Sequence, residues 1–146
     1  MPEAVIVATA RSPIGRAYKG SLIEVRADDL AAHAINAVME KVPEVERASV
    51  NDVMVGCGLT HAEQGFNLAR PASLLAAMPD TVPATTVNRF CASSLQTIRM
   101  AFHAIKAGEG DFSPIRLRLW RNSRSLRSLG NSRSLRSLGG QLASDL

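Results

Sequence analysis

Aromatic residues, cysteines and long apolar runs are all scarce in this chain of 146 residues. Aromatic residues make up 4% of the chain and hydrophobic residues 46%, so a core must be built from aliphatic side chains. Two cysteines, Cys57 and Cys91, are too few for a disulfide framework. The sequence has no CxxC pair and no His/Cys cluster with metal-ligand spacing, so we expect no metal site.

A secretory signal and a membrane span are also missing from the sequence. No basic N-terminal region precedes an apolar run, and no apolar stretch approaches the roughly 20 residues that a membrane span needs. We therefore expect a soluble, cytoplasmic protein with no membrane contact.

Charge divides the chain into two unlike parts. Residues 1–111 carry 10 Lys and Arg against 12 Asp and Glu, whereas residues 112–146 carry seven Arg and one Asp. The second part also repeats N-S-R-S-L-R-S-L-G, at 122–130 and 131–139, which are too few copies for a solenoid. We predict a domain over 1–111 and an Arg/Ser-rich tail over 112–146. The tail is interpreted as disordered or as translated out of frame; alternatively, it binds nucleic acid or other polyanions non-specifically.

Apolar patterning in residues 1–111 predicts alternating strands and helices. Short apolar runs at 4–8, 53–55 and 85–87 are typical of buried strands. Three helices follow them in turn. The first is capped by Asp28 or Asp29 and ends near Pro43, the second reaches about Ala77 with Pro71 in its first turn, and the third follows residue 91. The order β-α-β-α-β-α indicates an α/β fold with a parallel sheet.

Cys91 stands at the turn between the last strand and the last helix. A cysteine at the N-terminus of a helix meets unpaired N–H groups and the positive end of the helix dipole, which favour the nucleophilic thiolate. The helix carries an apolar stripe, and we expect this stripe, with Cys91 at its head, to face inward: Leu95, Ile98, Phe102 and Ile105. The alternative is that Cys91 is only a small buried hydrophobic residue.

Other candidates for chemistry are weaker. Cys57 lies between Gly56 and Gly58, where a small residue in a turn at the end of a strand is sufficient explanation. His61 is the nearest candidate for a general base, although its spacing does not place it beside Cys91. His33 and His103 are expected to be surface or packing residues.

Three segments resemble the thiolases, the acyl-CoA C-acyltransferases, in the family's order. They are A-R-S-P-I-G at 10–15, G-x-N-x-A-R at 65–70 and V-N-R-F-C-A-S-S-L-Q-T-I-R-M-A-F-H-A-I-K-A-G-E-G-D at 87–111. The last resembles the nucleophile segment, although many thiolases have Ser-Gly where this chain has Ser93-Ser94. The resemblance runs from about Pro2 to Asp111 and stops there.

The resemblance implies a layered α/β fold in which the helix that follows the cysteine is buried in the middle layer. It implies that Cys91 attacks an acyl-CoA thioester to form an acyl-enzyme, in thiolysis or condensation, and that its backbone N–H is an oxyanion donor. The G-x-N-x-A-R segment is expected to pack beside the nucleophile loop. No cofactor is implied beyond the coenzyme A thioester, which is the substrate, and the family suggests a homodimer or homotetramer in fatty acid metabolism.

The family's histidine and second cysteine come from its C-terminal half. We therefore expect this chain to be an inactive fragment. The alternative is a non-enzymatic relic, or a binding module that acts through its basic tail.

Overall fold

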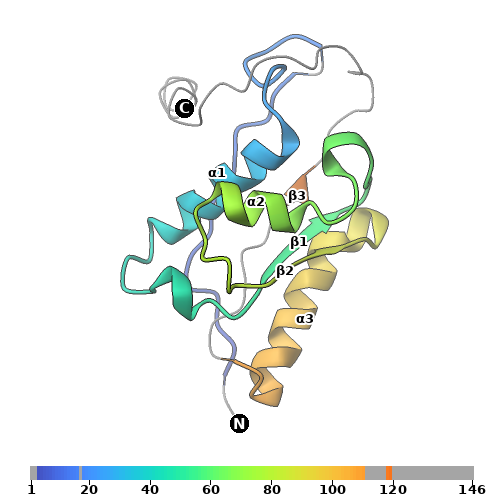
Figure 1. Cartoon of the computed structure of the whole chain (residues 1–146). Helices are drawn as coiled ribbons and strands as arrows, with labels where there is room; N and C mark the ends of the chain where they lie inside the picture. The colour runs from blue at the N-terminus through green and yellow to red at the C-terminus, as the bar shows by residue number, and fades with distance from the viewer. Residues whose placement is uncertain (1–2, 17, 111–117, 120–146) are drawn as a thin grey trace.

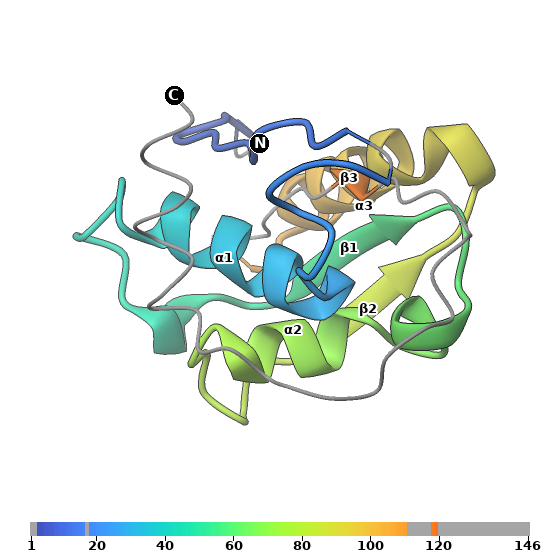
Figure 2. The ribbon, with the colours of Figure 1, turned by 90° about the horizontal axis from the view of Figure 1, so that it is seen from above.

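The computed structural model describes residues 3–16, 18–110 and 118–119. The order of elements is α1 (Ala27–Met39), η1 (Arg47–Ser49), β1 (Val53–Cys57), η2 (Ala62–Gln64), α2 (Ala69–Leu75), β2 (Ala84–Val87), η3 (Phe90–Ala92), α3 (Ser93–Ala107) and β3 (Arg118–Leu119), where η marks a short 3-10 helix. Helices α1 and α2 pack together on one face of a small sheet, and α3 covers the other face (Figures 1 and 2). The α/β class predicted from the alternation is confirmed.

The described sheet has the strand order β2-β1-β3, and both pairs are parallel. β1 pairs with β2 from Val53 opposite Ala84 to Gly56 opposite Val87. All five residues of β1 are buried, as its continuous run of small and apolar residues predicts for a central parallel strand. On the other edge, β3 pairs only with Gly56 and Cys57.

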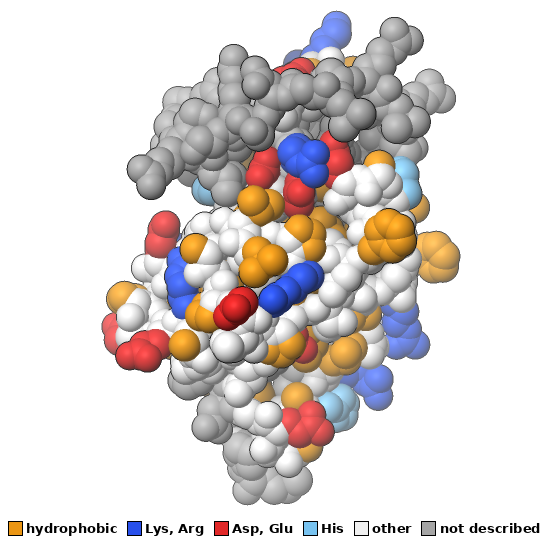
Figure 3. Space-filling view, in the orientation of Figure 1, with side chains coloured by type: hydrophobic (Ala, Val, Ile, Leu, Met, Phe, Trp, Pro, Cys, Tyr) orange, Lys and Arg blue, Asp and Glu red, His pale blue; other side chains and the backbone are white. Residues whose placement is uncertain are grey.

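The core between α1, α2 and the sheet is aliphatic, as the low aromatic content requires. Its fully buried members include Ile35 from α1, Val53 and Val55 from β1, and Leu68 at the start of α2. Arg47 closes one end of this layer, because its guanidinium donates to the backbone oxygen of Ala76 (2.7 Å) and to Oδ1 of Asn36 (2.9 Å). The outer side of α2 exposes Leu74 and Leu75, and hydrophobic side chains are visible over α2 in Figure 3.

The predicted N-terminal strand is wrong. Residues 4–8 form no strand, and Val5, Ile6 and Val7 are 66%, 78% and 71% exposed. The edge of β1 opposite β2, where this run would enter a parallel sheet, is paired with β3 at Gly56 and Cys57. Composition favoured a buried strand, but the pairing partner is decided by tertiary structure.

Several element ends also differ from the prediction. Arg26 is the N-cap of α1 and its side chain makes no capping hydrogen bond, so the predicted cap by Asp28 or Asp29 is wrong. Both aspartates lie in the first turn, where their negative charge interacts favourably with the positive end of the helix dipole. α1 ends at Met39, before Pro43, and α2 ends at Leu75.

Pro71 is the third residue of α2, and its predicted place in the first turn is confirmed. β3 lies within the predicted tail at 112–146, whereas both nonapeptide repeats lie outside the described residues.

Candidate functional site

Cys91 lies in η3, the short turn that joins β2 to α3. Side chains on either side hold this turn. Oδ1 of Asn88 accepts a hydrogen bond from the N–H of Phe90 (3.0 Å), and the hydroxyl of Ser93 accepts from the N–H of Arg89 (2.9 Å) and donates to the carbonyl oxygen of Phe90 (2.6 Å). Phe90 has a φ of +46°, which is unfavourable for a residue with a side chain. The turn before Cys91 is therefore strained and fixed by local hydrogen bonds.

Two glycines of the segment Gly56-Cys57-Gly58 allow this turn to approach the sheet. A Cβ on Gly56 would lie 2.5 Å from the backbone nitrogen of Ser94 and 2.7 Å from the carbonyl carbon of Ser93. A Cβ on Gly58 would lie 3.0 Å from the carbonyl oxygen of Phe90. The sequence alone predicts only a turn at these glycines. Their alternation around Cys57 was the available signal, since residues two apart in a strand share a face.

The predicted inward face of α3 is wrong. The side chains that face the sheet are small or hydroxylic: Ser93, Ser94, Thr97 and Ala101. Of the predicted stripe, Leu95 is 66% exposed and Phe102 43% exposed, whereas Ile98 and Ile105 are partly buried. Cys91 is exposed as well, so the alternative of a buried hydrophobic residue is also wrong. α3 is therefore rotated about its axis relative to the predicted orientation. The close approach at Gly56 explains this rotation, because only small residues of α3 fit against the β1 backbone.

Cys57 has the opposite environment. It is fully buried in β1, and its thiol lies 3.3 Å from the carbonyl oxygen of Leu59 and 3.5 Å from Oε1 of Gln64. Burial raises the pKa of the Cys57 thiol. A neutral, enclosed thiol is a packing group, as its place between two glycines predicts.

The histidines differ in their relation to the Cys91 turn. β1 and β2 are parallel, so the loop that carries His61 and the turn that carries Cys91 both begin at the carboxyl end of the sheet. His61 is exposed at the start of η2. His33 belongs to α1, in the layer on the other side of the sheet from α3, and His103 lies ten residues along α3 from Ser93, about 15 Å at the usual rise per residue.

The G-x-N-x-A-R segment fastens the start of α2 to the strand that leads to Cys91. Asn67 donates from Nδ2 to the carbonyl oxygen of Ala84 (2.9 Å) and accepts at Oδ1 from the hydroxyl of Thr86 (2.9 Å). The same hydroxyl accepts from the N–H of Ala69 (2.9 Å). Arg70 donates to the carbonyl oxygens of Val82 and Asp80. The expected packing role is consistent with these contacts, and none of them reaches a reacting group.

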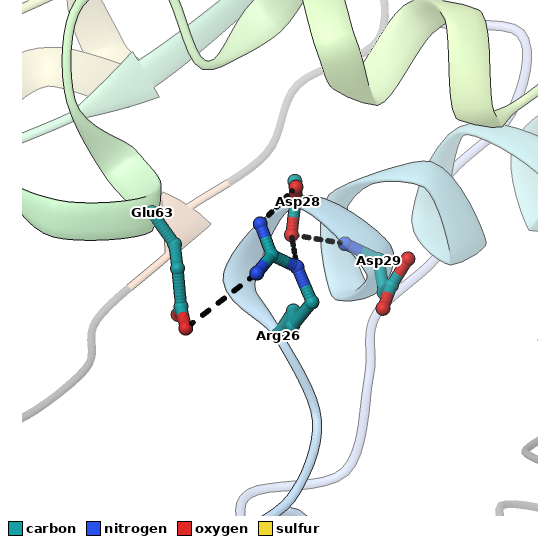
Figure 4. A network of polar contacts seen from close by, with 4 residues as sticks. All are labelled: Arg26, Asp28, Asp29 and Glu63. Atoms are coloured by element: carbon teal, nitrogen blue, oxygen red, sulfur yellow. Dashed lines mark hydrogen bonds and ion pairs between the residues drawn. The ribbon is translucent and has the colours of Figure 1, made fainter. Parts of the chain in front are cut away.

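A cluster of charged side chains joins the start of α1 to η2 (Figure 4). Arg26 forms two hydrogen bonds with Asp28 (3.0 and 2.9 Å) and a longer ion pair with Glu63 (3.9 Å). Burial, followed by the neighbouring Asp28, raises the pKa of Asp29. Because the arginine is committed to its carboxylate partners, the cluster is a structural link.

Among residues 3–16, 18–110 and 118–119, no group of three or more His, Cys, Asp or Glu side chains could hold a metal ion. No helix in the same part of the chain is both long and apolar enough to cross a membrane.

Comparison with known proteins gives one consistent family. The model of the thiolase N-terminal domain matches residues 4–113. Similar curated proteins named 3-ketoacyl-CoA thiolase come from Serratia proteamaculans (46% identical over 115 residues), Yersinia enterocolitica (44% over 115) and Erwinia tasmaniensis (46% over 109). The matches cover 79%, 79% and 75% of this chain. They cover only 30%, 30% and 28% of the relatives, so the chain spans less than a third of their length.

Proposed function

The chain belongs to the thiolase family, whose N-terminal domain it carries over residues 4–113, and we propose that it supplies the nucleophilic cysteine of an acyl-CoA C-acyltransferase. The observation that carries the proposal is the contrast between the two thiols. Cys91 is exposed in a strained, hydrogen-bonded turn at the head of α3, whereas Cys57 is enclosed in the core. Strain held in place by its surroundings is common at reactive positions.

The proposed step is an acyl transfer from sulfur to sulfur. The Cys91 thiolate attacks the carbonyl carbon of an acyl-CoA, a bond forms between Sγ and that carbon, and the bond to the coenzyme A sulfur breaks. Coenzyme A leaves as a thiolate and takes up a proton. In condensation, the carbanion of a second thioester then attacks the acyl carbon, a carbon–carbon bond forms, and the Cys91 thiolate is released. Thiolysis runs these steps backwards: the carbon–carbon bond breaks as Cys91 is acylated, and coenzyme A then accepts the acyl group. Developing charge on the carbonyl oxygen needs N–H donors, and the backbone of Cys91 is one candidate.

Turnover requires groups that these residues do not supply. A base must accept the thiol proton, and His33 and His103 are too far removed, which leaves only the exposed His61. The chain spans less than a third of its relatives' length, so we assign the remaining groups to the rest of a thiolase. The exposed stripe on α3, which includes Leu95 and Phe102, is where further protein would pack. We therefore propose that this chain is acylated slowly and does not turn over, and that any assembly resembles the oligomers of the family.

Acylation of the full chain by acetyl-CoA tests the proposal. Intact mass and peptide mapping should show one acetyl group, on Cys91. Release of coenzyme A should stop after one equivalent per protein chain. Cys57→Ser is the matched control and should be acylated as the unmodified chain is. Cys91→Ser should not be acylated. Loss of acid–base catalysis alone should slow the reaction roughly 10²- to 10⁴-fold relative to a complete enzyme.

Two outcomes would contradict the proposal separately. Acetylation at Cys57 to the same extent, or no acetylation at Cys91, would remove the nucleophile assignment. Multiple turnovers that disappear in Cys91→Ser would keep the nucleophile but disprove the inactivity of the chain.

The charge of residues 112–146 favours a second candidate function, binding of polyanions. Seven arginines stand against a single aspartate there. Binding to nucleic acids of different sequence should be equally strong and should fall steeply as salt rises, because bound counterions are released. Affinity that is independent of salt would eliminate this candidate. The repeats concerned lie outside the described residues.

A further inference from the structure

The backbone N–H groups around Cys91 differ in whether they have a partner. Three of them donate within the turn: Arg89 to the hydroxyl of Ser93 (2.9 Å), Phe90 to Oδ1 of Asn88 (3.0 Å) and Ala92 to the carbonyl oxygen of Arg89 (3.0 Å). The N–H of Ser93 donates to the carbonyl oxygen of Phe90. Within the described part of the chain, the N–H of Cys91 has no acceptor. This N–H is therefore left to donate to a ligand.

Ser93 acts on the peptide group that carries this N–H. The carbonyl of Phe90 and the N–H of Cys91 belong to one peptide group, which is planar and rigid. The oxygen of that group accepts from the hydroxyl of Ser93 (2.6 Å) and lies close to Gly58, where a Cβ would come within 3.0 Å of it. Contacts that fix the oxygen at one end of the plane also fix the direction of the N–H at the other end. A hydrogen bond to the oxygen also polarises the group and strengthens its N–H as a donor.

Asn88 restrains the residue before this peptide group. Phe90 has a φ of +46°, and the bond from its N–H to Oδ1 of Asn88 helps to hold this unfavourable conformation. Without that bond, Phe90 should return to a negative φ, which would rotate the peptide group and with it the N–H of Cys91. Asn88 is exposed, so its bond supports the turn and not the core.

We propose that Ser93, assisted by Asn88, is a positioning residue for the acyl transfer: its hydroxyl orients the N–H of Cys91 as a donor to the carbonyl oxygen of the acyl-CoA. This inference rests on the proposed function, in which the Cys91 thiolate attacks the carbonyl carbon. As that carbon becomes tetrahedral, negative charge develops on its oxygen, and a donor that is already oriented stabilises the charge without reorganisation. Ser93 and Asn88 act through the peptide group and touch no reacting atom.

Two reactions of the same thiol separate positioning from a loss of structure. Acylation by acetyl-CoA develops charge on a carbonyl oxygen, whereas alkylation by iodoacetamide displaces iodide at a saturated carbon and needs no donor to an oxygen. In the full chain, Ser93→Ala should slow the acylation of Cys91 roughly 10- to 100-fold, because the donor is misplaced and not removed. Its alkylation should stay unchanged. The measured quantity is the ratio of the two rates, with peptide mapping to locate both products.

Thr97→Val is the matched control. Thr97 is buried on the same face of α3 as Ser93, and its hydroxyl donates to the carbonyl oxygen of Ser94 (2.8 Å), within the helix. This variant removes a buried hydroxyl without touching the turn and should leave the ratio of rates unchanged.

Asn88 provides a second pair of variants. Asn88→Ala should lower the ratio of acylation to alkylation roughly tenfold, because the turn loses the acceptor for the N–H of Phe90. Asn88→Ser should recover most of this loss, since a serine hydroxyl accepts the same hydrogen bond more weakly. A purely structural defect would change both reactions together and leave their ratio as it is.

The folded state of each variant is verified by the slow alkylation of the buried Cys57. Ser93→Ala should fold, because the carbonyl oxygen of Phe90 keeps the N–H of Ser93 as a donor; if it unfolds, the exposed Asn88 decides the test. A lower ratio, with Thr97→Val unchanged, supports the proposal. An unchanged ratio in folded Ser93→Ala or in Asn88→Ala would overturn it and leave the nucleophile assignment standing. If acetyl-CoA does not acylate Cys91 of the unmodified chain, both fail.

Discussion

Replacement of Gly56 by alanine should open the sheet beneath the Cys91 turn. The added Cβ would lie 2.5 Å from the nitrogen of Ser94, 2.7 Å from its Cα and 2.7 Å from the carbonyl carbon of Ser93. All three are backbone atoms at the start of α3, so no side-chain rotation relieves the contact. An ordinary contact begins near 3.4 Å. The helix start would therefore move by about 0.9 Å, more than half the rise of one helical residue.

The expected cost is about 2–3 kcal/mol in the free energy of unfolding, at the upper end of what an overpacked methyl group costs. Cys57 is a built-in reporter, since it follows Gly56 in β1 and is fully buried. If its thiol reacts only after opening, a loss of 2 kcal/mol should speed its alkylation about 30-fold. The assay is labelling of Cys57 under native conditions, with the urea midpoint measured in parallel.

Gly15→Ala is the matched control. The three atoms nearest to its Cβ would all belong to the side chain of Leu22, at 3.0–3.2 Å, and Gly15 is exposed. Its stability should change by no more than about 0.5 kcal/mol. If Cys57 in Gly56→Ala is labelled no faster than in Gly15→Ala, the close approach of α3 to β1 is not real, and the explanation for the rotation of α3 fails with it.

Three further predictions follow from the buried groups and the two thiols. Cys91 should react with iodoacetamide at neutral pH well before Cys57; labelling of Cys57 at an equal or faster rate would contradict the assignment of the exposed thiol. Because burial raises the pKa of Cys57 above its usual 9.0, the folded state holds this proton more tightly, so its contribution to stability is complete below pH 9 and is lost as pH rises through the folded value. Urea unfolding from pH 8 to 10.5 should show this loss, and Cys57→Ala should reduce it. Arg47→Met should lower stability by about 2 kcal/mol, because the carbonyl of Ala76 and the amide of Asn36 lose a charged donor. An unchanged urea midpoint would show that water replaces both bonds.

Local pattern was enough to predict most of the elements. The spacing of apolar residues indicated α1 and α3, and short β-branched runs indicated β1 and β2, because these signals depend on neighbours in sequence. The turn that carries Cys91 was predicted for the same reason. Residues 4–8 carry an equally good strand signal, yet they form no strand. Strand formation there depends on which segment pairs with the free edge of β1, and no local sequence pattern contains that information.

The hydrogen bonds that hold the Cys91 turn were harder to foresee. Asn88 and Ser93 are ordinary polar residues in the sequence, and their roles appear only when their side chains meet the backbone of Phe90. The position of Asn88, two residues before Phe90, was a usable signal, because an asparagine side chain in a turn commonly accepts a hydrogen bond from the backbone N–H two residues later. The left-handed conformation of Phe90 had no signal at all, because phenylalanine is a poor choice there.

The orientation of α3 shows why a correct helix prediction gave the wrong face. A helix with one apolar stripe is expected to bury that stripe. In α3 the adjoining face is small and hydroxylic, and its hydroxyl groups are satisfied within the helix region, as Thr97 is by the carbonyl oxygen of Ser94 (2.8 Å). Such a face can be buried against Gly56 at no cost in unpaired polar groups, so α3 has two faces fit for burial. A helix of this kind belongs between two layers. The sheet covers one face here, and the stripe that begins beside Cys91 exposes Leu95 and Phe102. This exposure agrees with our proposal that further protein packs against the stripe.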